Sequence, residues 1–227
     1  MRGEMIEFTS DGGTTPGYLA RPAGGSGPGL VVIQEWWGLV GHIRDLVDRF
    51  AAAGFVALAP DLYHGEQAKS PDAAGKLMMA LDIARAGRDM RAAADHLLSL
   101  DGVQGDRVGI IGFCMGGQLA LHSGQEYPDR FGAVVDFYGV HPNAPLDPAR
   151  VKVPVLFHFA TRDDMTPPDV ANDLVSRLRG HGVEVEKHFY EADHAFFNDQ
   201  RPAVYDPGAS ALAWDRTLAF LRRHAGG

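Results

Sequence analysis

The stretch Val108-Gly109-Ile110-Ile111-Gly112-Phe113-Cys114-Met115-Gly116 decides the fold of this chain. Its apolar beginning is typical of a buried β-strand, and the residues that follow favour a helix. A Gly-x-nucleophile-x-Gly motif at such a junction predicts a sharp turn that exposes its central side chain at the carboxyl end of a sheet. The flanking glycines are required because side chains there would collide with neighbouring backbone. Cys114, the only cysteine of the 227 residues, is therefore a candidate nucleophile.

Two interpretations of Cys114 compete. A lone cysteine is commonly a buried and unreactive apolar residue, but the glycine frame favours the reactive interpretation. At a helix N-terminus the dipole and the free N–H groups are expected to favour thiolate over thiol. A single cysteine excludes an internal disulfide and a multi-cysteine zinc site, and no Cys/His pair has zinc-ligand spacing. We therefore expect no metal and no organic cofactor.

Composition limits the class of protein. The formal net charge of −8 argues against a general nucleic-acid binder, which needs a basic stripe. No segment approaches the roughly 18 consecutive apolar residues that span a bilayer, and the N-terminus lacks the apolar run of a signal peptide. We expect a single domain over residues 1–227 in the cytoplasm, as a monomer or small homo-oligomer, with neither nucleic acid nor membrane as partner.

Strand-like and helix-like segments alternate along the chain. This order predicts an α/β fold with about eight mostly parallel strands, helices on both faces and an N-terminal antiparallel hairpin. The helical stretch 73–100 is long and contains two glycines, so it is interpreted as one helix or two. The strands are expected at 5–9, 17–21, 29–33, 55–59, 108–113, 133–138, 153–159 and, nearer an edge, 183–190. The helices are expected at 43–53, 73–100, 117–126, 168–179 and 208–223.

A thiol nucleophile needs a base, and the base needs an orienting acid. In hydrolases with this turn, the chain order is nucleophile, acid, histidine. Asp163 and Asp164 follow one predicted strand, and His194 follows the next. Sequence logic does not choose between the two aspartates. His158 lies inside an apolar strand and is interpreted as a core residue, and Asp136 as structural.

The second informative stretch is Gln34-Glu35-Trp36-Trp37-Gly38, which follows the first buried strand. In this kind of fold the corresponding loop supplies one oxyanion-hole N–H, and the residue after the nucleophile supplies the other. The backbone N–H groups of Trp36 and Met115 are the candidates. Glu35 is expected to be partly buried, either in an ion pair with Arg44 or another basic residue, or as a carboxyl group with a raised pKa that exchanges a proton with Cys114.

With these pieces assembled, the chain resembles the dienelactone hydrolases (carboxymethylenebutenolidases) of the α/β-hydrolase fold, from about Met5 to Leu221. The resemblance implies a triad of Cys114, Asp163 and His194, with Glu35 as a gate on the thiol. It implies hydrolysis of a carboxylic ester or lactone through a cysteine thioester. The matching motifs are Gln34-Glu35, Ala59-Pro60-Asp61-Leu62-Tyr63, Gly112-Phe113-Cys114-Met115-Gly116-Gly117, Phe137-Tyr138-Gly139, Leu156-Phe157-His158 and Asp193-His194-Ala195-Phe196.

The chain departs from the family at the substrate site. The two arginines that hold the substrate carboxylate in characterised members fall near Pro71 and on Asn198, and neither of these can form a bidentate pair. Arg162, Arg85 and Arg201 are possible replacements. Trp36 and Trp37 instead suggest an aromatic, more apolar pocket wall; Trp37 is expected to pack in the core, although the sequence leaves open whether it lines the pocket. Preference for neutral substrates would show that the missing arginines matter. The predicted substrate contacts are Trp36, Tyr138, Phe196 and Asn198.

Two other classes of function fit parts of the pattern. One is a thiol-based redox or alkylation sensor, since an exposed thiolate oxidises readily; the absence of a second, resolving cysteine counts against it. The other is a non-catalytic small-molecule binder on the same scaffold. A binder has no reason to keep Cys114, Asp163, His194 and Glu35 together.

Overall fold

A computed structural model describes residues 2–226, so the two end residues of the predicted 1–227 domain lie outside it. Eight strands form one sheet in the order β1-β2-β4-β3-β5-β6-β7-β8. The pairs from β4 to β8 are parallel, whereas β1–β2 and β2–β4 are antiparallel. The predicted fold class is confirmed. The strands are β1 Glu4–Ser10, β2 Gly13–Ala20, β3 Gly27–Ile33, β4 Val56–Pro60, β5 Val103–Phe113, β6 Phe131–Phe137, β7 Val155–Arg162 and β8 Val185–Asp193.

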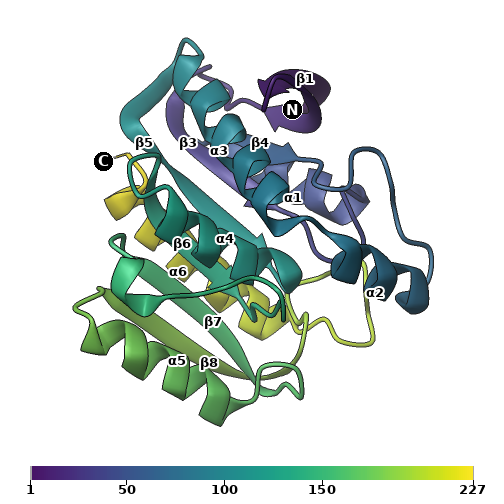
Figure 1. The fold of residues 1–227 in the computed structure, drawn as a ribbon, viewed down its shortest axis with the longest axis vertical. Coiled ribbons are helices and arrows are strands. Elements are labelled where there is room, and N and C mark those ends of the chain that lie inside the picture. Colours follow the sequence, from purple (N-terminus) through teal and green to yellow (C-terminus); the bar gives the residue numbers. More distant parts are fainter. Residues whose placement is uncertain (1, 227) are drawn as a thin grey trace.

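Helices cover both faces of the sheet, as Figure 1 shows. Helices α3, α4 and α5 lie on one face, and α1 and α6 on the other, where Phe50 of α1 packs on Trp214 of α6 with ring centres 4.7 Å apart. None of the helices described for residues 2–226 has the combination of length and hydropathy that crossing a bilayer demands. The helices are α1 Gly41–Ala52, α2 Pro71–Ala80, α3 Ile83–Ser99, α4 Met115–Glu126, α5 Pro168–Gly180, α6 Pro207–His224 and the short 3-10 helix Pro148–Arg150.

Local sequence explains where the elements begin and end. The predicted hairpin is formed by β1 and β2, with Asp11 and Gly12 both at positive φ in the turn. The predicted stretch 73–100 is two helices, but neither Gly75 nor Gly87 separates them. The break lies at Asp82, whose side chain accepts a hydrogen bond from the N–H of Arg85 at 3.0 Å and so caps α3.

The central parallel strands β3, β4 and β6 and the second half of β5 are buried on both faces, which explains why they read as continuous apolar runs. All seven residues of β6 are buried, and β8, which was expected nearer an edge, is the edge strand. His158, on β7, is a satisfied core residue, because its two ring nitrogens lie 2.9 Å and 3.0 Å from the hydroxyls of Tyr190 and Thr217. Buried, closely packed strands hold the residues that follow their carboxyl ends at constant positions relative to one another.

Asp136, near the end of β6, is an isolated carboxyl group in the core. It is 1% exposed, and neither oxygen makes a hydrogen bond of standard geometry within residues 2–226. The side chain fills the space beside Gly117 and Gly139, where an added Cβ would overlap its oxygens. Burial raises the pKa of Asp136 to about 7, and the nearby Gly139 backbone offsets only part of that effect. Asp136 is therefore a structural residue whose ionisation opposes folding.

We predict that Asp136→Asn changes the pH dependence of stability. The folded-state pKa of about 7 exceeds the unfolded value of about 3.9. The native state therefore holds the extra proton between these values, and its stability falls as pH rises through that window. The free energy of unfolding is measured in denaturant for both proteins from pH 4 to 8. The difference between Asp136→Asn and wild type should grow in favour of the variant by about 1.4 kcal/mol per pH unit, up to about 4 kcal/mol. Asp106→Asn, at an exposed site, is the control. The prediction is contradicted if the difference in unfolding free energy between Asp136→Asn and wild type does not change with pH.

Candidate functional site

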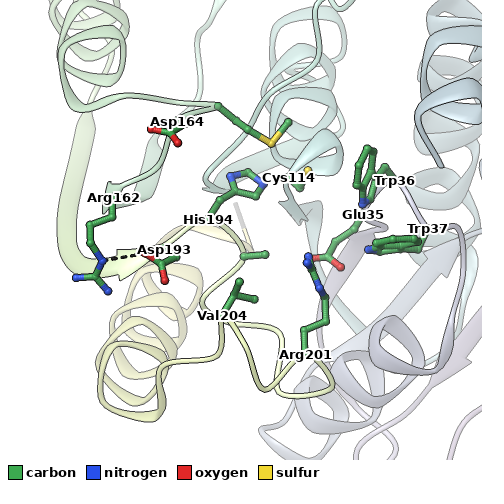
Figure 2. A pocket seen from close by; sticks show the side chains of 12 residues that line it. Glu35, Trp36, Trp37, Cys114, Arg162, Asp164, Asp193, His194, Arg201 and Val204 are labelled. Carbon is green, nitrogen blue, oxygen red and sulfur yellow. Dashed lines mark hydrogen bonds and ion pairs between the residues drawn. The ribbon is translucent and has the colours of Figure 1, made fainter. Parts of the chain in front are cut away.

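Four of the predicted residues meet at the carboxyl edge of the sheet. Cys114 follows β5, Asp163 follows β7, His194 follows β8, and Glu35 lies two residues after β3. Parallel strands end at the same edge, which is where open α/β sheets collect their ligands. All but Asp163 line one cavity of about 330 Å³, which Figure 2 shows from close by. The lining residues are Glu35, Trp36, Trp37, Cys114, Arg162, Asp164, Met165, Asp193, His194, Ala195, Arg201 and Val204.

The turn that carries Cys114 has the predicted geometry. Cys114 adopts φ +54° and ψ −120°, a conformation that side chains rarely adopt and that stores strain. A Cβ on Gly112 would overlap the carbonyl of Gly116. A Cβ on Gly116 would lie 2.7 Å from the carbonyl oxygen of Ile33 and closer still to that of Gln34. The expectation that both glycines avoid collision with backbone is confirmed.

His194 is paired with Asp163. Its Nδ1 lies 2.7 Å from Asp163 Oδ2, and the other carboxylate oxygen accepts hydrogen bonds from the N–H groups of Met165 and Thr166 at 2.8 Å and 3.0 Å. Burial acts to raise the pKa of Asp163, but the hydrogen bond and charge of His194 and the two N–H donors outweigh it and lower the pKa. Asp164 is exposed and lines the cavity without this hydrogen bond. The geometry thus separates two aspartates that sequence logic left equal.

Glu35 is buried without an ion pair. It is 1% exposed, and its Oε2 accepts a hydrogen bond from Asn198 Nδ2 at 2.8 Å. Its Oε1 is buried and has no hydrogen-bond partner within residues 2–226. Burial raises the pKa of Glu35, while the Asn198 hydrogen bond and the charges of Arg201 and His194 act to lower it. Of the two interpretations of Glu35, an ion pair is not observed among the described residues, and the raised pKa agrees with the second; the proton exchange with Cys114 stays a prediction.

The expectation that the turn favours a thiolate is wrong for the resting structure. Cys114 is 5% exposed, and burial together with the negative charge of Glu35 raises the pKa of its thiol well above the ordinary value. The backbone of Met115 at the helix start and the charge of Arg201 act to lower the pKa, but they are the smaller effects. Cys114 is therefore a thiol until its surroundings change.

The two predicted oxyanion-hole residues lie next to the thiol. Met115 is the first residue of α4, so its N–H has no partner within the helix. Trp36 lines the cavity, and its N–H enters no hydrogen bond recorded for residues 2–226. Tyr63 contacts both residues, since its hydroxyl lies 3.3 Å from the Trp36 carbonyl oxygen and 3.3 Å from Met115 Sδ.

Three of the four predicted substrate contacts lie beneath the cavity rather than on its wall. Tyr138 and Phe196 are fully buried, and Asn198 is bonded to Glu35. The Tyr138 ring packs against the His194 ring with centres 4.9 Å apart, and its buried hydroxyl has no hydrogen-bond partner among the described residues. Only Trp36 lines the cavity as predicted. The expectation that Trp37 packs in the core is wrong, because it is half-buried and lines the cavity too.

Two guanidinium groups reach the cavity, which the sequence did not show. Arg162 is bonded to Asp193 at 2.8 Å, whereas Arg201 lies with its guanidinium carbon 5.8 Å from the centre of the Trp37 ring. Both appear beside the cavity in Figure 2. Arg85 lines a different cavity, and Pro71 begins α2. The signal for Arg201 was its place in the loop after His194, but a loop sequence does not reveal side-chain direction.

One cluster outside the cavity has ligand types suited to a metal. Single ligand atoms of Glu184, Glu186 and His224 lie within 4.8 Å of one another, and the cluster lies at the amino end of β8. That end of the sheet is opposite to Cys114. Within residues 2–226 no such group of three ligand atoms lines the cavity.

Comparison with known proteins agrees with the geometry. Residues 15–225 match the dienelactone hydrolase family. The chain is 38% identical to the protein usf of Aquifex pyrophilus and 35% identical to a putative carboxymethylenebutenolidase of Aquifex aeolicus, each over 98% of this chain and 99% of the relative. A crystal structure of a putative dienelactone hydrolase from Klebsiella pneumoniae superposes with a TM-score of 0.88 at 30% identity, covering 97% of this chain and 98% of that one.

We predict that the turn tolerates no side chain at Gly116. Gly116→Ala places a methyl group against the backbone carbonyls at the end of β3, so the helix start must move. The free energy of unfolding should fall by about 1–3 kcal/mol or more, and alkylation of Cys114 by iodoacetamide should change rate. Gly75→Ala is the matched control, because a Cβ there meets nothing within 4 Å. It should stabilise the helix by about 0.5–1 kcal/mol, and equal effects of the two variants would contradict the prediction.

Proposed function

The chain belongs to the dienelactone hydrolase family, and from that premise we propose that it hydrolyses a carboxylic ester or lactone through a thioester on Cys114. The family assignment makes it a hydrolase of the α/β-hydrolase fold. The observation that carries the proposal is the 2.7 Å hydrogen bond between His194 and Asp163 at the edge of a cavity that also holds Cys114 and Glu35. A base with its orienting acid beside a strained nucleophile is the arrangement that acyl transfer needs.

In the acylation step the thiol proton of Cys114 passes to Glu35, and the resulting thiolate attacks the substrate carbonyl. The carbonyl oxygen becomes an oxyanion, and the N–H groups of Trp36 and Met115 are the proposed donors to it, which is supported by Trp36 lining the cavity and by Met115 starting α4. Collapse of this intermediate breaks the carbon–oxygen bond of the ester or lactone. The alkoxide takes the proton that Glu35 received from Cys114 and leaves as an alcohol, and the acyl group stays on sulfur as a thioester.

In the deacylation step His194 acts as general base. Its Nε2 is buried and has no hydrogen-bond partner among the described residues, so it is free to accept a proton from water. Asp163 fixes the ring orientation and stabilises the imidazolium that forms. Hydroxide adds to the thioester carbonyl, the carbon–sulfur bond breaks, and the carboxylic acid is released with Cys114 restored.

The substrate is proposed to be small, with an apolar or aromatic part. The cavity has a volume of about 330 Å³ and an aromatic wall of Trp36 and Trp37. Arg201 lines the cavity and is available to pair with an acidic substituent of the substrate. The case for a preference for neutral substrates is therefore weaker than the sequence suggested. Tyr138 and Phe196 are proposed to support His194 and the cavity floor instead of touching substrate, because both are fully buried.

We predict that Cys114→Ala abolishes hydrolysis. The thiol is the only sulfhydryl of the chain, and without it turnover of p-nitrophenyl acetate should fall to the uncatalysed rate while thermal unfolding stays close to wild type. Unchanged turnover would refute the mechanism. Loss of activity on exposure to peroxide, in a protein with no esterase activity, would favour the redox sensor. Tight ligand binding that survives the substitution, again without turnover, would favour the binder.

We predict different effects at the two neighbouring aspartates. Asp163→Asn removes the acceptor of His194 and favours the wrong tautomer, which costs about 10⁴-fold in kcat in a serine-based triad. Asp164→Asn is the matched control because it makes the same chemical change one residue away, outside that hydrogen bond. It should retain kcat within about tenfold. Initial rates on p-nitrophenyl acetate measure both, and the reverse ranking would assign the acid to Asp164.

A further inference from the structure

We propose that Asn198 is the positioning residue of this site: its amide holds Glu35 by one carboxyl oxygen and leaves the other free to take the proton of Cys114. This inference rests on the proposed function for its place in catalysis, and it can be tested without turnover. The bond joins residues 163 positions apart in the chain, Nδ2 of Asn198 to Oε2 of Glu35 at 2.8 Å. Both side chains are buried.

The direction of the amide is determined by two partners. Asn198 Oδ1 accepts a hydrogen bond from the N–H of Gln200 at 3.1 Å, so the Nδ2 group must face the carboxyl group. The backbone around it is also held, because the Asn198 N–H donates to the Ala195 carbonyl at 3.0 Å and the Arg201 N–H donates to the Asn198 carbonyl at 3.0 Å. An amide fixed at both ends presents its donor at a constant position.

The consequence for Glu35 is an asymmetric carboxyl group. Its Oε2 has a donor, whereas its Oε1 is buried and has no hydrogen-bond partner among the described residues. A buried unpaired oxygen is costly and calls for a role. Glu35 lines the cavity together with Cys114 and His194, and its charge acts on the thiol directly. In the transfer the S–H bond breaks, an O–H bond forms at Oε1, and the electron pair stays on sulfur.

The neutral charge of the amide matters for this transfer. The groups that face Glu35 are Cys114, Tyr138, His194, Arg201 and Asn198. Among them Asn198 makes the only direct hydrogen bond recorded to the carboxyl group. It favours the ionised form, but burial is the stronger effect and leaves the pKa of Glu35 raised. An ammonium or guanidinium at the same place would hold Glu35 as a carboxylate and weaken it as a proton acceptor.

The test is the pH dependence of Cys114 alkylation by iodoacetamide, which needs no substrate turnover and reports one cysteine only. In wild type the rate should rise with pH until Glu35 ionises and then level off, because from there the thiol proton passes to Glu35 internally. Asn198→Ala removes a hydrogen bond to the charged form, so the start of this plateau should move up by about one pH unit or more. Asn198→Asp adds a like charge and should move it further.

Two further variants separate positioning from a general structural effect. In Glu35→Gln the plateau should disappear, and adding Asn198→Ala to it should then produce no shift. Asn143→Asp, an exposed asparagine on a different loop, is the matched control and should behave as wild type. Each variant is checked by thermal unfolding; if Asn198→Ala does not fold, Asn198→Asp and Asn198→Ser carry the comparison.

The outcomes decide the proposal separately from the hydrolase function. An unmoved plateau in the Asn198 variants, or a shift that persists in the Glu35→Gln background, overturns the positioning role. Such a result leaves the hydrolysis experiment on Cys114→Ala untouched. Conversely, the plateau could shift as expected in a protein that hydrolyses no ester. That result would support the coupling of Asn198, Glu35 and Cys114 but would contradict its role in ester hydrolysis.

Discussion

Close backbone contact between the β5–α4 turn and the end of β3 brings Cys114 and Glu35 to the same cavity. Gly116 packs directly on the carbonyl groups of Ile33 and Gln34, with no room for a side chain between them. One residue beyond Gln34 is Glu35, and two residues before Gly116 is Cys114. Contact between backbone atoms therefore sets the relative positions of the Cys114 and Glu35 backbones. Such a contact is stiffer than one made through rotatable side chains. The rest of the sheet supports that contact.

This arrangement concentrates unfavourable features at one edge of the sheet. Cys114, Tyr138 and Ala195 all have positive φ, and each directly or nearly follows a strand. The same edge holds several buried atoms without a hydrogen-bond partner within residues 2–226, among them Glu35 Oε1, the Tyr138 hydroxyl oxygen and His194 Nε2. Strain and unsatisfied polar atoms persist only where the surrounding structure imposes them, and they collect at functional sites. Fully buried strands such as β6 contribute the stability that offsets the free-energy cost of this strain and of these unpaired atoms.

Local patterns predicted the parts that depend on local physics, and three-dimensional packing decided the rest. The glycine frame and the strand ends placed Cys114 and His194 correctly, because steric fit and strand termination are encoded within a few residues. Strand ends alone did not choose the partner of His194, since adjacent aspartates point in different directions from one loop; only the family resemblance favoured Asp163, which is the residue paired with His194. The state of Cys114 was misjudged because burial and the Glu35 charge outweigh the helix dipole. Trp37 lines the cavity although it was expected in the core, and Tyr138 is buried although it was expected to contact substrate. Both errors arise because the sequence does not reveal the direction of a side chain.

The protonation state of Cys114 also discriminates between the classes of function considered from sequence. A redox-sensing cysteine is exposed and has a low pKa, often with a resolving cysteine beside it. Cys114 is nearly buried, the pKa of its thiol is raised, and it is the only cysteine. Oxidation of a cysteine follows its thiolate character and its exposure, and both are low here. In the proposed mechanism the reactivity of Cys114 depends on a proton acceptor inside the cavity, and Glu35, whose Oε1 has no hydrogen-bond partner among the described residues, is the proposed acceptor. This arrangement suits a nucleophile that is activated for a bound substrate.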